Sequence, residues 1–318
     1  MSKFAIAIHG GAGTILKEEM TPELELAYRK SLQQALDAGY AVLENGGSAL
    51  EAVKNAIMIL EDEPLFNAGK GSVFTKDGLN EMDACIMDGA NLEAGAIAAV
   101  QHVRNPIVLA EKVMLNSGHV FLSGQGAEEF ARQQEIRMEP AEYFFSQHRY
   151  DQLLRMKDSD QFQLDHSTTT AHPHTDKKFG TVGAVACDKS GNIAAGTSTG
   201  GMTNKQFGRI GDSPMIGAGT YANNKTCAIS CTGHGEIFIR AVAAYDVSCM
   251  MEYRNMNLQD ACNEVVMNKL VAMEGEGGLI GIDAMGNSSL VFNSAGMYRG
   301  ERKSDGTNRV AIYGDDNP

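Results

Sequence analysis

The sequence has 318 residues, of which 43% are hydrophobic and 21% are charged. These proportions are typical of a globular protein with a large buried core, and they exclude a largely disordered chain. The formal net charge is −13, so general electrostatic attraction to nucleic acid or to an anionic membrane is not expected. We therefore expect small molecules or peptides as partners.

The apolar runs are short. Runs such as residues 4–8 and 96–100 fall far below the ~20 residues that span a bilayer. The first residues also lack the apolar region and cleavage site of a signal peptide, so we expect a cytoplasmic protein. The six cysteines contain no CxxC pair, which favours reduced thiols in the core over disulfides or a metal site.

Helix boundary signals are clear in the first quarter of the chain. Residues 4–8 are continuously apolar and precede Gly10-Gly11, which predicts a buried strand that ends in a sharp turn. Thr21 before Pro22 is a typical helix start. Ser48, three residues before a glutamate, predicts a capping box at the start of a second helix that ends before Pro64.

The rest of the chain alternates strand-like and helix-like patterns. We predict strands at 82–87, 96–100, 119–122, 182–187, 193–197, 226–230, 279–282 and 289–293, and helices at 107–115, 126–134, 237–251 and 258–273. The pair 182–187 and 193–197 reads as a hairpin, and the pair 279–282 and 289–293 as a final one. Two mostly antiparallel sheets with helices outside each would bury these patterns, so we expect an α+β fold, a four-layer αββα sandwich.

One hydroxyl stands in an unusual place. Hydrophobic patterning disappears over about residues 157–178, which predicts a mobile linker. A buried strand is predicted to begin soon afterwards at Thr181, directly after Gly180. Threonine favours strands in any case, so a structural role stays open. The functional alternative is autoproteolysis, in which the Thr181 hydroxyl attacks the Gly180 carbonyl and the new α-amine becomes a built-in base. Such an amine titrates near ~7.7 to 8.0, which suits proton transfer near neutral pH.

Six glycine-containing motifs together carry a family resemblance. They closely resemble the plant-type L-asparaginase and isoaspartyl peptidase (β-aspartyl peptidase) family from about residue 4 to residue 300. The motifs are HGGAG (9–13), FNAG (66–69), GTVGAV (180–185), TSTGG (197–201), GRIGDSP (208–214) and TGHGE (232–236). The resemblance implies an N-terminal-nucleophile (Ntn) hydrolase that forms one domain over residues 1–318. It further implies self-cleavage into an α chain, 1–180, and a β chain, 181–318, assembled as (αβ)₂.

The resemblance also implies residue roles around Thr181. Thr181 would be the nucleophile, and the hydroxyl of Thr199 would orient or activate it. Arg209 would bind a substrate α-carboxylate and Asp212 an α-ammonium, a pairing that suits a free amino-acid head group. Without the resemblance, a surface salt bridge would be the favoured interpretation of an Arg-x-x-Asp pair, and Thr199 would equally be an ordinary strand residue.

Further positions match the family's substrate pocket. By resemblance Thr232 and Gly233 form the oxyanion hole, through a hydroxyl and a backbone N–H, and Gly235 belongs to the substrate pocket. Asn67 would support the site by hydrogen bonds. His234 receives no catalytic role, because a neutral hydrogen-bonded histidine explains it.

No catalytic cofactor is expected. HGGAG lacks the spacing of a nucleotide-binding loop, and His172 and His174 in the predicted linker show no metal-ligand spacing. By resemblance alone, the stretch 60–70 would hold a structural sodium ion through backbone carbonyls. The residues concerned are Leu60, Glu61, Glu63, Phe66, Ala68 and Lys70.

The resemblance implies an activity, and two alternatives stay open. We expect hydrolysis of L-asparagine to L-aspartate and ammonia, and of β-aspartyl (isoaspartyl) dipeptides, through acylation of Thr181. Glycosylasparaginase shares the fold and nucleophile, but the lack of a signal peptide and the glycine before Thr181 count against it. An uncleaved, non-catalytic relative that binds amino acids or a partner is the alternative from another class.

Overall fold

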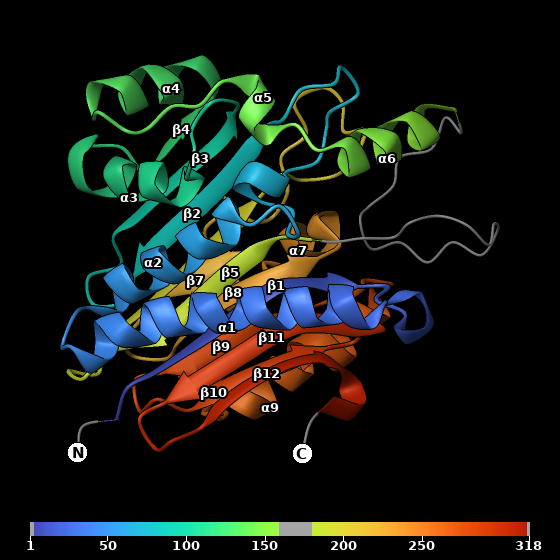
Figure 1. Cartoon of the computed structure of the whole chain (residues 1–318). Helices are drawn as coiled ribbons and strands as arrows, with labels where there is room; N and C mark the ends of the chain where they lie inside the picture. The colour runs from blue at the N-terminus through green and yellow to red at the C-terminus, as the bar shows by residue number, and fades with distance from the viewer. Residues whose placement is uncertain (1–2, 159–179, 317–318) are drawn as a thin grey trace.

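Two β-sheets form the centre of the computed structural model, which describes residues 3–158 and 180–316 (Figure 1). Within these residues the large sheet has the strand order β12 (Asn308–Tyr313), β11 (Gly296–Lys303), β1 (Ala5–Gly13), β5 (Val182–Cys187), β6 (Ile193–Thr199), β2 (Met82–Asp88), β3 (Ala94–Val100) and β4 (Phe121–Ser123). The small sheet has the order β10 (Ser288–Phe292), β9 (Gly277–Asp283), β8 (Cys227–Gly233) and β7 (Thr220–Ala222). Neighbouring strands run antiparallel, apart from the parallel pair of β3 and β4.

Helices cover both outer faces. The large sheet packs against α1 (Pro22–Glu44), α2 (Ala49–Asp62) and α3 (Pro106–Asn116), and the small sheet packs against α8 (Ala243–Arg254) and α9 (Leu258–Asn263). The remaining helices are α4 (Gly124–Gln133), α5 (Ala141–Phe144), α6 (Gln147–Asp158), α7 (Gly235–Ala241) and α10 (Leu270–Ala272). Short 3₁₀ turns cover Lys17–Glu19, Gly69–Gly71 and Gly314–Asp316, and a π-helix covers Glu264–Lys269. In Figure 1, α1 and α2 are drawn in blue across the large sheet.

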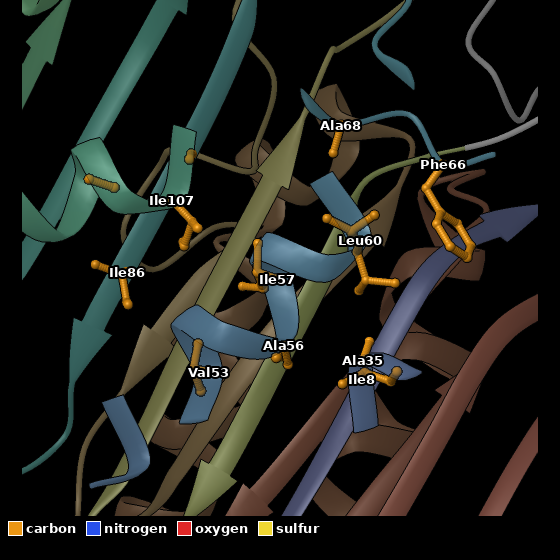
Figure 2. Packing of buried hydrophobic residues seen from close by; sticks show 14 of the residues in the cluster. Ile8, Ala35, Val53, Ala56, Ile57, Leu60, Phe66, Ala68, Ile86 and Ile107 are labelled. Atoms are coloured by element: carbon orange, nitrogen blue, oxygen red, sulfur yellow. The ribbon is translucent and has the colours of Figure 1, made fainter. Parts of the chain in front are cut away.

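Three buried hydrophobic clusters separate four layers. The first lies between α1–α3 and the large sheet and includes Ile57 and Leu60 of α2 and Ile86 of β2 (Figure 2). The second lies between the two sheets and includes Val185, and the third lies between the small sheet and its helices and includes Val265. The predicted four-layer α+β sandwich is therefore confirmed.

The predicted starts of the first two helices are also confirmed. The Thr21 hydroxyl accepts a hydrogen bond from the Leu24 N–H, and Pro22 occupies the first helical position of α1. The Ser48 hydroxyl accepts from the N–H of Glu51 at 3.2 Å. Both side chains satisfy backbone donors that the helix itself leaves without partners.

The turn predicted at Gly10-Gly11 is wrong. β1 continues through the glycines to residue 13, with a register shift between His9 and Gly11 against β11. A β-bulge of this kind bends a strand without ending it. The glycines here therefore belong to an irregular strand, and the backbone of Gly11 lies against that of Gly180, as described below.

Two predicted helices are interrupted. The helix predicted over 237–251 breaks at Val242, which has φ 50° and divides α7 from α8. The first N–H groups of α8 bond elsewhere: Ala244 donates to the Ala218 carbonyl and Tyr245 to the Gly217 carbonyl. These tertiary bonds hold a β-branched residue in a left-handed conformation that sequence propensity disfavours. The second helix, predicted over 258–273, contains the π-helix.

The C-terminal hairpin β11–β12 was not predicted. It follows residues 279–293, which the sequence pattern predicts as the final hairpin. Its strand β11 pairs with β1 in the large sheet. β11 buries Arg299 and Glu301, so it lacks the apolar alternation that identifies a strand. β7, α5 and α6 also went unpredicted.

The linker prediction is only partly covered by the structure. Lys157 and Asp158 belong to α6, so a linker beginning at residue 157 is wrong. The other residues, 159–178, lie outside the described residues. All six cysteines are free thiols, as predicted. Within residues 3–158 and 180–316, no helix is both long and apolar enough to cross a membrane.

Candidate active site

Thr181 lies immediately before β5, in the middle of the large sheet. Its side chain is buried, and Oγ1 donates to Thr199 Oγ1 at 3.1 Å and lies 3.3 Å from Ser213 Oγ. Thr199, at the end of β6, also accepts the N–H of Gly201 at 3.0 Å. The structure thus brings Thr181 and Thr199 together as predicted, and adds Ser213 as a third hydroxyl.

The bulged part of β1 lies against the Gly180–Thr181 peptide bond, which is the bond expected to be cleaved. The carbonyl of Thr181 lies 3.0 Å from His9 Nδ1. Gly11 has φ +115°, and a Cβ there would lie 2.9 Å from the Gly180 carbonyl oxygen. Only glycine allows β1 this close to Gly180, because other residues rarely adopt that conformation and would collide with the peptide.

A small pocket opens beside Thr181. Its lining residues are Gly180, Thr181, Thr199, Gly201, Met202, Arg209, Gly211, Asp212, Ser213 and Gly233. Six of these were predicted from the sequence. The pocket therefore places the hydroxyl of the proposed nucleophile and both proposed head-group ligands around one space.

Arg209 is paired with Glu236 rather than with Asp212. Its Nε and Nη2 atoms donate to the two carboxylate oxygens of Glu236 at 2.9 and 3.0 Å. Such a two-point contact is the geometry with which a guanidinium grips a carboxylate. A Cβ on Gly235 would lie 2.8 Å from Arg209 Nη2 and 2.9 Å from Asp212 Oδ1, so this glycine keeps space open between the two side chains.

Asp212 carries a buried carboxyl oxygen. Its Oδ2 atom has no hydrogen-bond partner among the described residues. Burial raises the pKa of Asp212 to about 7, although nearby Arg209 acts in the opposite direction. A buried carboxylate that lacks a full set of donors is suited to receiving a cationic group from a ligand.

Thr232 and Gly233 form the end of β8, which faces the large sheet across the site. Thr232 is fully buried, and its Oγ1 accepts the N–H of Ala12 at 3.3 Å. That bond uses an oxygen lone pair and leaves the hydroxyl proton for another acceptor. Gly233 lines the pocket and has φ +149°. Gly233 therefore shares the pocket with Thr181, and Thr232 precedes it on the same strand.

Asn67 ties the loop after α2 to the loop after β6. Its Nδ2 donates to the Gly201 carbonyl at 2.8 Å, and its Oδ1 accepts the N–H of Val73 at 3.0 Å. The Gly200 N–H donates to the Asn67 carbonyl at 3.1 Å. Asn67 therefore supports the segment that continues from Thr199.

The stretch proposed to hold sodium lies apart from the pocket, at the end of α2 and in the loop that follows. The backbone packs closely there: a Cβ on Gly69 would lie 2.4 Å from the Glu61 carbonyl oxygen, and a Cβ on Gly71 would lie 2.0 Å from that of Phe66. The Glu61 Oε2 atom is also buried without a hydrogen-bond partner in the described chain. Carbonyl and carboxylate oxygens are the ligand type that a hard cation takes.

Gly201, Met202 and Gly211 of the pocket lining were not assigned from the sequence, and neither were four residues that make side-chain contacts at or near the site. Ser213 and Glu236 belong to quoted motifs, GRIGDSP and TGHGE, yet their spacing gave no chemical signal. His9 was quoted in HGGAG, and Ser230, which contacts it, in none of the six. A long-range contact joins each of them to the site, and no local pattern predicts such contacts.

Comparison with known proteins identifies the family. The profile of the family described as "Asparaginase" matches residues 2–312. An isoaspartyl peptidase from Salmonella typhimurium is 52% identical, with 98% of this chain and 99% of the relative covered. One from Escherichia coli is 51% identical, with 98% and 97% covered. A probable isoaspartyl peptidase/L-asparaginase 2 from Arabidopsis thaliana is 41% identical, with 98% and 100% covered. With its fold, its pocket and these matches in agreement, the chain belongs to the asparaginase family.

Proposed function

We propose that the chain cleaves itself between Gly180 and Thr181 and then hydrolyses L-asparagine and β-aspartyl dipeptides. One observation carries the proposal: the Thr181 hydroxyl, held by Thr199 and Ser213, opens into a pocket that Arg209 and Asp212 also line. The names of the relatives support the same substrates. Incubation with L-asparagine, a β-aspartyl dipeptide and N-acetylglucosaminyl-asparagine, followed by measurement of released aspartate, tests the proposal and separates it from glycosylasparaginase activity.

Self-cleavage would begin at the Thr181 hydroxyl. Its Oγ1 attacks the Gly180 carbonyl carbon, the Gly180–Thr181 C–N bond breaks, and the nitrogen takes up a proton to become the α-amine. Water then hydrolyses the resulting ester, which leaves a carboxylate on Gly180 and restores the Thr181 hydroxyl. The residue now carries nucleophile and base together.

Substrate hydrolysis would use the same hydroxyl. The α-amine of Thr181 accepts the proton of Oγ1 as the oxygen attacks the β-carbonyl carbon of the substrate. The Thr232 hydroxyl and the Gly233 N–H donate to the developing oxyanion, and each such donor typically contributes ~10²- to 10³-fold in rate. The ammonium of Thr181 then protonates the departing amine, and water releases L-aspartate from the acylated threonine.

When substrate binds, its α-carboxylate would replace the Glu236 carboxylate on Arg209. In the structure Arg209 is held by Glu236, so the substrate α-carboxylate takes the place of a protein carboxylate on the same guanidinium. The α-ammonium meets Asp212, whose buried oxygen gains an ionic partner. These two contacts select free α-amino acids and their β-linked derivatives.

The remaining expectations form part of the same proposal. The fragments 1–180 and 181–318 would assemble as (αβ)₂ in the cytoplasm. Carbonyl oxygens around Glu61, Phe66 and Ala68 would hold a structural sodium ion that fixes the loop carrying Asn67. All the groups that act on the substrate belong to the chain itself.

The pH dependence should follow Asp212. Since its pKa is raised to about 7 by burial, the carboxyl is mostly protonated at pH 6 and mostly ionised at pH 8, and only the ionised form pairs with an α-ammonium. We expect ionisation of Asp212 to contribute about a tenfold rise in kcat/KM for L-asparagine between these pH values, in addition to the rise from deprotonation of the Thr181 α-amine. In Asp212→Asn only the α-amine contribution should remain, so the rise between pH 6 and pH 8 should be about tenfold smaller than in the wild type. An unchanged profile in the variant would contradict the assignment.

Adding a methyl group at Gly235 should weaken substrate binding. In Gly235→Ala the new Cβ displaces Arg209 and Asp212, which lie under 3.0 Å from its position. We expect KM to rise about tenfold or more, with little change in thermal stability. Gly126→Ala in α4 is the matched control, because a Cβ there meets nothing within 4 Å. Equal kinetics in the two variants would remove Gly235 from the pocket.

A further inference from the structure

His9 is a buried histidine to which the proposed mechanism gives no role. It is completely buried on β1, opposite Gly183 of β5. Its two ring nitrogens have different partners: Nδ1 lies 3.0 Å from the carbonyl oxygen of Thr181, and Nε2 lies 2.9 Å from Ser230 Oγ. The ring thus joins the backbone of the proposed nucleophile to the small sheet.

The two partners determine which nitrogen carries the proton. Burial lowers the pKa of His9 to about 3, although the bond to Thr181 acts in the opposite direction, so the ring is neutral. A carbonyl oxygen can only accept, which places the proton on Nδ1. Nε2 is then an acceptor, and the Ser230 hydroxyl donates to it.

A row of hydroxyls holds Ser230 in that orientation. Thr197 Oγ1 lies 2.7 Å from Ser230 Oγ, and Thr220 Oγ1 lies 2.6 Å from Thr197 Oγ1. Each hydroxyl has one proton. Because the proton of Ser230 is used on His9, Thr197 is the donor in its bond to Ser230, which is shorter than its contact with the Gly219 carbonyl at 3.3 Å. Thr220 likewise lies closer to Thr197 than to its other acceptor, the Ser213 carbonyl at 3.0 Å, and donates to Thr197. All donors in this row therefore point toward His9 and, through its ring, toward Thr181.

The backbone keeps space for this contact. A Cβ on Gly183 would lie 2.0 Å from Ser230 Oγ and 2.4 Å from His9 Nε2. The second glycine of GTVG therefore occupies a position where any side chain would break the bond between His9 and Ser230. This steric observation is independent of the hydrogen-bond geometry.

We propose that His9 is a positioning residue: as the Nδ1–H tautomer, locked by the hydroxyl row, it holds the Thr181 carbonyl and so orients the side chain and α-amine of the nucleophile. The inference rests on the proposed function. After self-cleavage Thr181 begins a chain, and its amino end is no longer tethered. The bond from His9 then restrains the residue from its carbonyl side, while Thr199 and Ser213 restrain Oγ1.

Two substitutions at residue 9 separate orientation from packing. In His9→Asn the amide nitrogen reaches the position of Nδ1 and can still donate to Thr181. In His9→Gln it reaches the position of Nε2 and loses that bond. With cleaved protein and a β-aspartyl dipeptide as substrate, we expect kcat to fall by no more than about tenfold in His9→Asn. In His9→Gln we expect kcat to fall about 100-fold. KM should stay unchanged in both variants. Equal losses of kcat in both variants would overturn the proposal.

A second pair of variants tests the hydroxyl row. Ser230→Ala removes the donor to His9, whereas Ser248→Ala removes an equally buried hydroxyl that pairs with Thr226 at 2.6 Å, away from the site. Ser230→Ala should lower kcat about tenfold and Ser248→Ala less than twofold. Equal effects would show that only the loss of a buried hydroxyl matters, and would overturn the role of the row.

The tautomer itself can be observed without any substrate. In ¹⁵N-histidine-labelled protein, long-range ¹H–¹⁵N correlation spectra should show His9 as neutral with the proton on Nδ1, its signals being those missing from His9→Asn and His9→Gln. A proton on Nε2, or on both nitrogens, would overturn the proposal even if no residue-9 variant matures. Wild-type protein without β-aspartyl hydrolysis would instead contradict the proposed function and leave this result standing.

Discussion

Replacing Thr181 with alanine is expected to leave a single uncut chain of 34.1 kDa that hydrolyses neither L-asparagine nor β-aspartyl dipeptides. The change removes the only oxygen that Thr181 can offer both to the Gly180 carbonyl and to substrate. Loss of a nucleophile of this kind costs on the order of 10⁴- to 10⁶-fold in kcat. Denaturing mass spectrometry and an aspartate-release assay measure the two effects separately.

Two further threonine variants control for packing at Thr181. Thr226→Ala removes a buried threonine hydroxyl that contacts Ser248, and this variant should cleave and hydrolyse normally. Thr181→Ser keeps the hydroxyl and should recover cleavage and part of the hydrolysis. Activity retained in Thr181→Ala, or lost equally in Thr226→Ala, would eliminate Thr181 as nucleophile.

Replacing Arg209 with alanine should cost about 2 to 5 kcal/mol of substrate binding in the transition state, equivalent to a drop in kcat/KM of about 30- to 5,000-fold. The guanidinium is mostly buried, with 18% of its side chain exposed, so water replaces its carboxylate contacts poorly. Self-cleavage should persist, since no contact links Arg209 to the Gly180 carbonyl among the hydrogen bonds of the described chain. Steady-state kinetics on L-asparagine measure the drop.

A second substrate and a control variant at a distant arginine test whether the effect of Arg209→Ala is specific to the α-carboxylate. L-asparaginamide lacks the α-carboxylate, so wild-type protein and Arg209→Ala should differ little on it. Arg29→Ala breaks a partly buried ion pair with Glu25 and Asp316 and should leave kinetics unchanged. Were Arg209→Ala to lose as much on the amide as on L-asparagine, the guanidinium would not be the carboxylate ligand.

Local signals explain what the sequence could predict. Thr21 and Ser48 cap their helices by bonds to N–H groups three residues away, a distance at which residue type is informative. The αββα layers follow from apolar patterns that must all be buried. Thr181 and Asp212 were located through motifs, and the structure gathers them around one pocket.

The parts that escaped prediction depend on distant contacts. Val242 breaks a helix because the adjoining helix turn bonds to Gly217 and Ala218. The partner of Arg209 is Glu236 in the first turn of α7, whereas an Arg-x-x-Asp pattern favours Asp212. The same holds for His9, whose contacts lie 172 and 221 residues away in sequence.

The glycine clusters marked segments near the site, but the sequence did not show why glycine is required there. The cluster at residues 9–13 was interpreted as a turn, yet it is a bulged strand whose Gly11 packs against Gly180. Gly183 and Gly235 likewise keep space for neighbouring side chains. Close approach and turning both demand a missing Cβ, and one sequence does not distinguish them.

Self-cleavage at Gly180–Thr181 is the central claim, and the mass of the denatured protein tests it most directly. Freshly purified and aged protein should yield fragments of about 19 and 15 kDa, scaled from 34.1 kDa by 180 and 138 of 318 residues. N-terminal sequencing of the smaller fragment should read Thr-Val-Gly-Ala-Val. A chain that stays at 34.1 kDa while hydrolysing β-aspartyl dipeptides, or a cut at any other bond, would contradict the account.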